Sequence, residues 1–494
     1  MAEEFAVKLS QAKAPFVLAL DVGSTAARGG LFDAKGRPIL GTRIKVDHDF
    51  ATSSSGRSAI SPDLVVDEVT AIIDAIVTKR LAGKIAAVAM DTFSSAVVGV
   101  DDGGAAITPC FTYADSRPAS DVSYLLRRTD EVALQHRTGT RLHSSYLPAR
   151  LHWLRRVEPD TFDLAETWMS LGEYVYLRLL GVRGASMSSA AWTGLLNRHT
   201  GQWDPEAVEL AGITMDRLSP VLPGAETFTT SPRMAQRWPG LADSVWLPAI
   251  PDGYASTLGP VTDERTITLG SSTSGAMRLL VNGIPGEIPP GLWAYRVHED
   301  RTLVGGALND VGRMVTWLDS TINVPNKAIR ESWMRGRPNP ASPIVLPFLT
   351  GERSTGWRSD ARAIIGDIGE STDAAALYRG GIEGIAMTYR RVAEQMAEVS
   401  GDINGIVATG GITQSFPGWL HVLANVLGMP VTPKAMKRST LRGAALLALD
   451  HVAPGIERTI HETADPVVPN RAWVSEYNAR YERFCELYET LYGV

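Results

Sequence analysis

The stretch near the start of the chain that indicates its fold is Phe16-Val-Leu-Ala-Leu-Asp-Val-Gly-Ser-Thr-Ala-Ala-Arg-Gly-Gly-Leu-Phe-Asp33. An apolar run ends at Asp21, a Gly23-Ser24-Thr25 corner follows, and a second apolar segment starts at Arg28. This pattern predicts a β-hairpin. Glycine lets the backbone approach a bound group closely, and the two hydroxyl groups can donate hydrogen bonds to phosphate oxygens. The corner is therefore a candidate phosphate-binding site with Asp21 placed to hold a cation, although a plain Asx turn would give the same pattern.

Length and composition are those of a globular protein with more than one domain. The chain has 494 residues, of which 44% are hydrophobic and 21% charged, and this length exceeds what a single core normally supports. Lys and Arg number 48 against 54 Asp and Glu, which gives a net charge of -6. Because no basic cluster with interleaved aromatic residues stands out, nucleic acid is not expected as a partner.

Cysteine usage and the N-terminus both indicate a cytoplasmic protein. The two cysteines, Cys110 and Cys485, are too few for a disulfide framework or a four-thiolate metal site. The N-terminus does not have the pattern of a signal peptide, and no apolar stretch has membrane-spanning length, so no membrane partner is expected. There is also no Walker P-loop and no Gly-x-Gly-x-x-Gly fingerprint. A bound nucleotide would therefore need another architecture.

Beyond the hairpin, the pattern predicts a third strand over residues 39–46 and then a helix. Ser61-Pro-Asp63 is a typical helix start, and apolar residues follow at helical spacing as far as Ile76. A short buried strand over residues 85–90 then ends at Asp91. Residues 112–211 contain several helical runs and four tryptophans, which predicts helices inserted over one face of the first domain, with the tryptophans in the core.

A second strand-corner-strand unit is expected at residues 265–281, where Gly270-Ser271-Ser272 stands as Gly23-Ser24-Thr25 stands in the first. A long amphipathic helix over residues 374–400 then leads into a buried strand at 403–408, as the first helix leads into 85–90. This repetition predicts two α/β domains of like topology around a shared cleft, with chance similarity as the alternative. The chain ends in a helix whose aromatic stripe, from Trp473 to Tyr488, is expected to be a docking face.

With both corners in hand, the chain resembles the FGGY carbohydrate kinases, whose fold class includes actin, hexokinase and the Hsp70 ATPase domain. The resemblance extends over nearly the whole chain through separate motifs in the expected order. They are Leu20-Asp-Val-Gly-Ser-Thr-Ala-Ala-Arg28, Tyr113-Ala-Asp-Ser-Arg117, Pro251-Asp-Gly-Tyr-Ala-Ser-Thr-Leu-Gly259, residues 269–278, Gly305-Gly-Ala-Leu-Asn309, Gly351-Glu-Arg-Ser354, Thr409-Gly-Gly-Ile-Thr-Gln-Ser415 and Leu441-Arg-Gly-Ala-Ala-Leu446.

The resemblance implies a fold and an activity. The implied fold is α/β, with two actin-like, ribonuclease-H-like domains, at residues 1–257 for sugar binding and the catalytic base and at 258–494 for the nucleotide, and an active site in the cleft between them. Residues 168–175, 191–197 and 295–318 are most similar to gluconokinases. The implied activity is transfer of a phosphoryl group from ATP, with Mg²⁺, to a hydroxyl of a small sugar or sugar acid, gluconate first. A homodimer is a possible assembly.

Two alternatives stay open. One is a ketopentose or polyol kinase of the same family. The other is a nucleotide-driven binding module of the actin or Hsp70 kind, which would hydrolyse ATP slowly without any sugar. Asp252, in its Pro-Asp-Gly context, and the lack of an added peptide-binding domain argue against the module.

The resemblance also assigns roles to single residues. Asp252 matches the catalytic aspartate, which would accept the hydroxyl proton, although Pro251-Asp-Gly253 alone could be a simple turn. Asp21 would hold Mg²⁺ through water molecules. The nucleotide side is assigned to Ser24, Thr25, Arg28, Gly270, Ser271, Gly312, Gly411 and Ser415. The sugar side is assigned to Ser94, Ser95, Asp115, Arg117, His143, Tyr146 and Gly253.

The sequence departs from the family pattern at two places on the sugar side. Ser94-Ser95 stands where gluconokinases and xylulokinases usually carry Met-His, and Tyr113 stands where a tryptophan is usual. Loss of an imidazole removes a fixed hydrogen bond to a substrate hydroxyl group, and such groups decide which substrates a site accepts. The identity of the sugar and of the hydroxyl group that is phosphorylated is therefore left open by the sequence.

Overall fold

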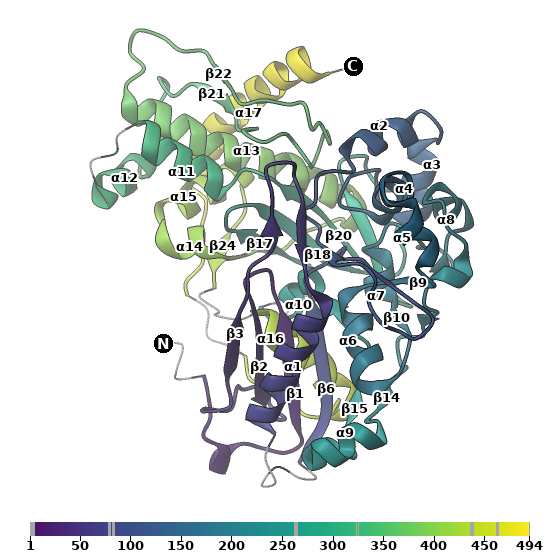
Figure 1. Cartoon of the computed structure of the whole chain (residues 1–494). Coiled ribbons are helices and arrows are strands. Elements are labelled where there is room, and N and C mark those ends of the chain that lie inside the picture. Colours follow the sequence, from purple (N-terminus) through teal and green to yellow (C-terminus); the bar gives the residue numbers. More distant parts are fainter. Residues whose placement is uncertain are drawn as a thin grey trace.

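Two α/β halves, one stacked on the other, and a helical lobe at one side make up the chain (Figure 1). The computed structural model describes residues 5–77, 81, 84–260, 265–322, 324, 326–434, 439–460 and 464–493. Among these residues no helix is long and apolar enough to cross a membrane. The two-domain α/β fold predicted from the sequence is confirmed.

The first half is built on a seven-stranded sheet. Its strands are β1 (Phe16–Val22), β2 (Ala26–Phe32), β3 (Ile44–Asp47), β6 (Ile85–Thr92), β14 (Phe228–Thr229), β15 (Val245–Trp246) and β16 (Ile250–Pro251). Their order is β14-β15-β6-β1-β2-β3, and β16 also pairs with β6. Strand β1 is antiparallel to β2 and parallel to β6, so the predicted hairpin is confirmed. The predicted third strand is shorter than expected, because β3 pairs with β2 only from Ile44 onward.

The second half repeats this arrangement. Its sheet contains β17 (Thr266–Ser271), β18 (Gly275–Asn282), β19 (Trp293–His298), β20 (Arg301–Leu308), β23 (Gly405–Thr409) and β24 (Val431–Pro433), in the order β19-β20-β18-β17-β23-β24. Strand β17 is antiparallel to β18 and parallel to β23, as β1 is to β2 and β6. The predicted internal duplication is therefore confirmed at the level of strand order and direction.

Each half places a helix before its parallel strand. Helix α1 (Pro62–Ile76) begins after Ser61, whose side chain accepts a hydrogen bond from the Leu64 backbone, and its apolar face is buried. A cap of this kind typically contributes about 1 kcal/mol. Helix α13 (Ala374–Ser400) begins after Asp373, which caps it in the same way. Both helices lie where the apolar spacing predicted them.

Two further helices cross between the halves. Helix α10 (Asp252–Leu258) packs against α16 (Ser439–Val452), and α16 also packs on β1 and β6 of the first sheet. A Cβ atom on Gly443 would lie 1.8 Å from the Ala255 carbonyl oxygen, and one on Gly259 would lie 2.2 Å from that of Ser439, so the crossing needs glycine at both places. Figure 1 shows α16, in yellow-green, beside the purple N-terminal strands. Helix α16, which follows the predicted boundary at residues 257/258, thus packs on the sheet that precedes it.

The helical lobe comes from the predicted insertion. The insertion supplies α2 (Ala119–Leu126), α3 (Glu131–Thr138), α4 (Leu147–Val157), α5 (Pro159–Leu164), α6 (Leu171–Leu180), α7 (Met187–Ala191) and α8 (Pro205–Leu210). Of these, α6 packs on α1 and β6 of the first sheet. Trp153, Trp168 and Trp192 are buried there, as predicted for core residues. Short strands in the first half are β4 (Ala51–Thr52), β5 (Ser58–Ile60), β7 (Val98–Val100), β8 (Cys110–Phe111), β9 (Thr167–Met169), β10 (Ala185–Ser186), β11 (Leu196–Asn197), β12 (Gln202–Trp203) and β13 (Val221–Leu222).

The last helix, α17 (Arg471–Tyr492), docks by its aromatic stripe. Tyr477, Tyr481, Phe484 and Tyr488 are buried in the core of the second half, so the predicted docking face is confirmed. The remaining elements are α9 (Pro232–Arg237), α11 (Gly312–Thr321), α12 (Lys327–Met334), α14 (Gly411–Ser415), α15 (Gly418–Leu427), β21 (Ile344–Leu346) and β22 (Ile364–Gly366).

Candidate active site

Three carboxylates meet at the ends of three neighbouring strands of the first sheet. Asp21 of β1 lies directly opposite Asp91 of β6 in the parallel register. Asp252 follows β16, which pairs with the same end of β6. Carboxyl ends of parallel strands share one edge of a sheet, so the fold collects these side chains at the junction between the halves. Asp91 was not among the predicted site residues, although a carboxylate at the end of a buried strand was a usable signal.

Asp252 is the first residue of α10, and its Oδ1 atom is held by two donors. Ser94 Oγ donates to Oδ1 at 2.6 Å, and the backbone N–H of Gly253 donates to the same atom at 2.7 Å. Among the described residues the second oxygen, Oδ2, has no donor, which leaves it able to receive a proton. The structure thus brings together two predicted residues, Ser94 and Asp252.

Asp21 and Asp91 are both buried but differ in their partners. Asp21 Oδ2 lies 3.4 Å from Arg28 Nη1 and accepts a hydrogen bond from Thr440 Oγ1 at 3.2 Å. Neither oxygen of Asp91 has a hydrogen-bond donor among the described residues. Burial raises the pKa of Asp21, against the lowering effect of the Arg28 charge. Burial, followed by the charges of Asp21 and Asp252, raises the pKa of Asp91 well above its ordinary value.

A buried imidazole holds the first hairpin corner. The backbone N–H of Gly23 closes the corner by donating to the Ala26 carbonyl oxygen at 3.1 Å. His48 Nε2 lies 2.8 Å from the Gly23 carbonyl oxygen, and its Nδ1 lies 2.7 Å from Glu68 Oε2. The ring therefore bridges the corner to Glu68 of helix α1. Sequence patterns gave no sign of this support.

The second corner lies beside a cavity of about 710 Å³, a size that suits a nucleotide. The predicted residues Gly312 and Gly411 line it, and Trp317, Leu349 and Ile412 provide apolar surface. The other lining residues are Ser272, Thr273, Arg313 and Thr316. This arrangement fits a planar apolar base with polar groups near the corner.

Three predicted nucleotide residues need correction in their placement. Ser271 pairs with Gly275 across the hairpin, so the corner consists of residues 272–274 and Gly270 and Ser271 belong to strand β17. Ser271 is fully buried with its Oγ 3.5 Å from Tyr389 Oη, and it does not face the cavity. Ser415 ends helix α14 and does not line the cavity. The prediction aligned Gly270 with Gly23. The strand pairing instead aligns Gly270 with Asp21, so the two corners differ by two residues from the predicted alignment.

A chain of contacts links three of the predicted sugar residues, Ser95, His143 and Tyr146, to the carboxylates. The region that these residues form is called the acceptor side below. Ser95 adopts φ +54°, an uncommon conformation for serine, and its Oγ donates to the Trp192 carbonyl oxygen at 2.8 Å. His143 meets Tyr146 edge to face, and Tyr146 Oη lies 2.5 Å from Tyr295 Oη. Burial and the charges of Arg353 and Arg150 lower the pKa of His143 to about 3. His143 is therefore a neutral hydrogen-bonding group at physiological pH.

Asp115 and Arg117 bind mainly to each other. Arg117 Nη2 lies 2.5 Å from Asp115 Oδ2, and its guanidinium group lies over the Trp153 ring. Asp115 also accepts from the backbone N–H of Ser58. Among the described residues, neither side chain has a hydrogen bond to Ser94, Ser95, His143 or Tyr146. The structure therefore shows this pair as a support for the loop around residue 115, and contact with a sugar remains a prediction.

The second half contributes acceptor-side groups that the sequence reasoning missed. Tyr295 stacks on Trp192, with ring centroids 3.8 Å apart, and Trp192 lies beside Gly253. A Cβ atom on Gly253 would lie 3.2 Å from the Trp192 ring and 3.4 Å from Arg278 Nη2. A side chain at position 253 would therefore press on the Trp192 ring. Arg353, within the Gly351-Glu-Arg-Ser354 motif, adds a second cation.

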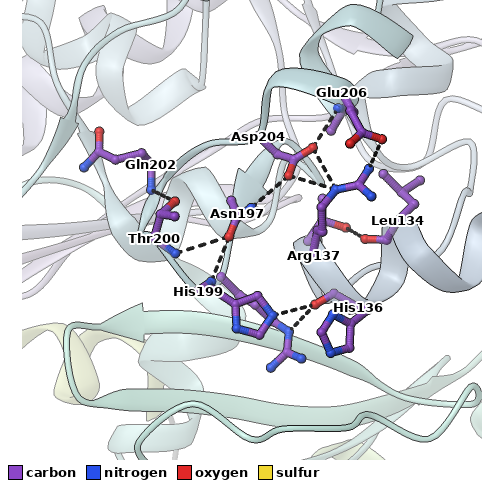
Figure 2. A network of polar contacts seen from close by, with 12 residues as sticks. Leu134, His136, Arg137, Asn197, His199, Thr200, Gln202, Asp204 and Glu206 are labelled. Atoms are coloured by element: carbon purple, nitrogen blue, oxygen red, sulfur yellow. Dashed lines mark hydrogen bonds and ion pairs between the residues drawn. The ribbon is translucent and has the colours of Figure 1, made fainter.

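A polar network fixes the segment that follows Trp192 (Figure 2). Asp204 accepts hydrogen bonds from Arg137 Nε at 3.1 Å and from the Asn197 side chain at 2.9 Å. Arg137 also pairs with Glu206 at 2.8 Å. These contacts tie the β11–β12 hairpin to α3. They thereby support the segment that carries Trp192, whose ring stacks on Tyr295.

The carboxylates at this edge of the first sheet are compatible with a divalent cation that keeps its water molecules. Among the described residues, no three His, Cys, Asp or Glu side chains are arranged to hold a metal ion directly. The unpartnered oxygens of Asp91 and the partly paired Asp21 nevertheless place carboxyl oxygens beside the first corner. Mg²⁺ keeps several of its water molecules when bound, so the residues fit a hydrated ion.

Comparison with known proteins agrees with this geometry. Two family models match the chain, the N-terminal domain of the FGGY family of carbohydrate kinases at residues 16–257 and its C-terminal domain at residues 273–450. A gluconokinase of Bacillus subtilis is 24% identical over 451 residues, which cover 88% of this chain and 87% of that protein. A glycerol kinase of Allorhizobium ampelinum is 26% identical, with 90% and 92% covered.

A solved structure of gluconate kinase from Lactobacillus acidophilus superposes with a TM-score of 0.89 at 24% identity, covering 97% of this chain and 99% of that one. At this identity the superposition shows the fold alone. The two family matches span most of the chain in the order of the family's two domains. The chain is therefore a kinase that transfers a phosphoryl group from ATP to a small carbohydrate, and it belongs to the FGGY family of carbohydrate kinases.

Proposed function

We propose that the chain phosphorylates a hydroxyl group of a small carbohydrate with Asp252 as the general base, and that gluconate is the first acceptor to test. The observation that carries this proposal is the placement of Asp252, which begins the helix between the halves and has one carboxylate oxygen fixed by Ser94 and Gly253. Gluconokinases among the similar proteins support gluconate as the first choice.

The proposed roles follow from what phosphoryl transfer requires. The transition state is loose, so the protein must position the reactants, neutralise charge and accept the hydroxyl proton. Asp252 Oδ2 would take the proton, while Ser94 keeps the carboxylate oriented. The cavity beside residues 272–274 would hold ATP. When bound, a hydrated Mg²⁺ near Asp21 and Asp91 would supply charge neutralisation for the phosphates. Ser24, Thr25 and Arg28 would bind phosphate oxygens from the first corner.

The test compares the unmodified protein with Asp252→Asn. ADP release from Mg-ATP is measured with gluconate, xylulose, ribulose, glycerol and erythritol, and without any acceptor. The unmodified protein should release ADP fastest with one acceptor, and Asp252→Asn should lower that kcat by about 10²- to 10⁴-fold, because only the base is lost. ATP binding, measured by calorimetry, should be unchanged. Near-normal turnover by the variant would remove Asp252 from its role.

The no-acceptor sample separates the kinase from the binding module. Equal, slow ADP release in every sample would favour the nucleotide-driven module. Turnover with a ketopentose or polyol alone would select the alternative substrates. Cytoplasmic location and a homodimer stay predictions of the sequence.

A further inference from the structure

Two arginines on the acceptor side have no anionic partner. Among the described residues, neither Arg278 nor Arg353 forms an ion pair or a side-chain hydrogen bond, and the Nε atom of each is buried without an acceptor. By contrast, Arg198 donates to three backbone carbonyl groups, and Arg379 pairs with Glu383 at 2.9 Å. Guanidinium groups inside a protein normally have such partners, so two half-buried arginines whose side chains have no acceptor in the described part of the chain point to a place for an anion.

The two guanidinium groups lie around Asp252 and the predicted sugar residues. Arg278 is beside Gly253, where a Cβ atom would lie 3.4 Å from its Nη2 and 3.5 Å from its Nε. The Arg353 guanidinium lies 6.0 Å from the centre of the Trp357 ring, and that ring meets His143 at 5.8 Å. Burial, and after it the charge of Arg353, lowers the pKa of His143, and the same charge opposes the burial that raises the pKa of Tyr146. Both arginines therefore belong to one electrostatic environment.

The position of this pair argues for an anion on the acceptor and not on the nucleotide. The first corner already has Arg28 paired with Asp21, and the nucleotide cavity has Arg313, which pairs with Asp310 at 3.0 Å. Arg278 is four residues beyond Ser274 along β18, roughly 13 Å at the rise of a strand. Arg353 lies near Trp357, whose ring meets the predicted sugar residue His143.

We propose that Arg278 and Arg353 bind a carboxylate of the acceptor, so that the substrate class is a sugar acid and not a neutral polyol or ketose. Guanidinium groups bind carboxylates through paired, charge-assisted hydrogen bonds. Neither guanidinium group has an ion pair of its own among the described residues, so an acceptor carboxylate would supply one. This inference rests on the proposed function and adds the chemical class of its substrate.

The experiment uses matched acceptors that differ only in their charged end. ADP release is measured with the full chain for gluconate against glucitol, xylonate against xylitol, erythronate against erythritol and glycerate against glycerol. One acid should give a kcat/KM at least about 10-fold above its polyol, because charge-assisted hydrogen bonds of this kind are worth about 10- to 100-fold in affinity. Binding of the same acids without ATP is measured by calorimetry.

Three variants separate recognition of the acid from other roles. Arg353→Met and Arg278→Met should each raise the KM and the Kd for the acid by about 10- to 100-fold, leave the KM for ATP unchanged and reduce the preference for acid over polyol. Arg353→Lys should keep part of the preference, because it keeps the charge but loses the paired hydrogen bonds. The control Arg483→Met removes an exposed arginine paired with Asp367 and should change none of these values.

The outcomes distinguish the two proposals. If a polyol or ketose is turned over in an Asp252-dependent way with no preference for the acid, this inference is overturned and the proposed function stands. If the arginine variants raise the KM for ATP and leave the acid preference intact, the pair binds phosphate and the inference is likewise overturned. Acid binding that the variants abolish supports the inference even where ADP release is slow. No acceptor-dependent ADP release and no acid binding would overturn both.

Discussion

The two hairpins of the molecule pair their strands in the same directions but carry different side chains at equivalent positions. In the first, Asp21 lies opposite Arg28 on one side and Asp91 on the other. In the second, the equivalent strand β17 places Gly270 opposite Ala276 and Thr409. Three charged positions in one half thus correspond to three small, uncharged positions in the other. The duplicated fold has concentrated charge in the first half and left space in the second.

This difference indicates how the labour is divided. Near the first corner, Asp21, Asp91 and Arg28 lie at one buried edge of the sheet. These groups suit control of a metal ion and a reacting hydroxyl group. The second corner lies beside the 710 Å³ cavity, where small residues let a nucleotide approach the backbone. Each half can be altered toward the other to test this division.

The largest loss of activity is expected when Asp21 of the first half is replaced by glycine, the residue at the equivalent position of the second half. Asp21→Gly should lower kcat/KM by on the order of 10²- to 10³-fold, because the charge that would organise the phosphates and the metal is lost. A change at the equivalent position in the second half, Gly270→Ala, adds a Cβ atom whose nearest neighbour, the Ala276 carbonyl oxygen, is 4.0 Å away, and should cost less than about 10-fold. Steady-state kinetics with both variants would contradict the comparison if the two losses were equal.

A smaller effect is expected from filling the space beside the second corner. In Gly312→Ala the new Cβ would lie 2.4 Å from the Ser272 carbonyl oxygen, so the corner must shift and the KM for ATP should rise by about 10-fold. At Gly411 a Cβ atom meets nothing within 4 Å, so any effect of Gly411→Ala reports contact with the nucleotide itself. A KM for ATP unchanged in Gly312→Ala would show that the cavity is not the nucleotide site.

The smallest effect concerns stability at Asp91. Burial and the charges of Asp21 and Asp252 raise the pKa of Asp91 well above its ordinary value of 3.8. The folded state therefore holds this proton more tightly than the unfolded chain, so the contribution to stability is full below pH 3.8 and is lost as the pH rises toward the raised pKa. Asp91→Asn should remove this pH dependence and gain on the order of 1 kcal/mol at pH 8.

Denaturant unfolding at pH 5 and pH 8 measures this prediction. The unmodified protein should lose stability relative to Asp91→Asn between the two values. If the difference in the free energy of unfolding between the two proteins were the same at pH 5 and pH 8, Asp91 would be charged in the folded state at both pH values. Thr409→Val, at the equivalent position in the second half, should show no such pH dependence.

Local patterns predicted most of the fold. The apolar spacing predicted α13 over residues 374–400, and Ser61-Pro-Asp63 predicted the start of α1. Family motifs led to Asp252 and Ser94, which the structure places 2.6 Å apart. Each of these predictions rests on a local motif, although the Ser94–Asp252 contact itself joins residues 158 positions apart.

What the sequence did not predict depends on contacts between distant segments. Arg278 and Arg353 reach the acceptor side from the second half, and no spacing in the sequence indicates that Trp357 would meet His143. The register of the second hairpin also could not be predicted from its glycines, because Ser271 pairs with Gly275 only through the strand ladder. Asp91 was visible as the end of a strand, but its lack of partners follows from tertiary burial.

The return of α16 to the first sheet has a consequence for the order in which the chain becomes folded during synthesis. Leu441, Ala444, Ala445 and Ala448 pack against Val17, Ala19 and Ala89 in one buried cluster. A nascent chain that has emerged only as far as residue 257 therefore exposes one face of its central strands to solvent. The first-made half is completed only when the ribosome has produced residues near 450, so a fragment cut between the halves would expose an apolar sheet face.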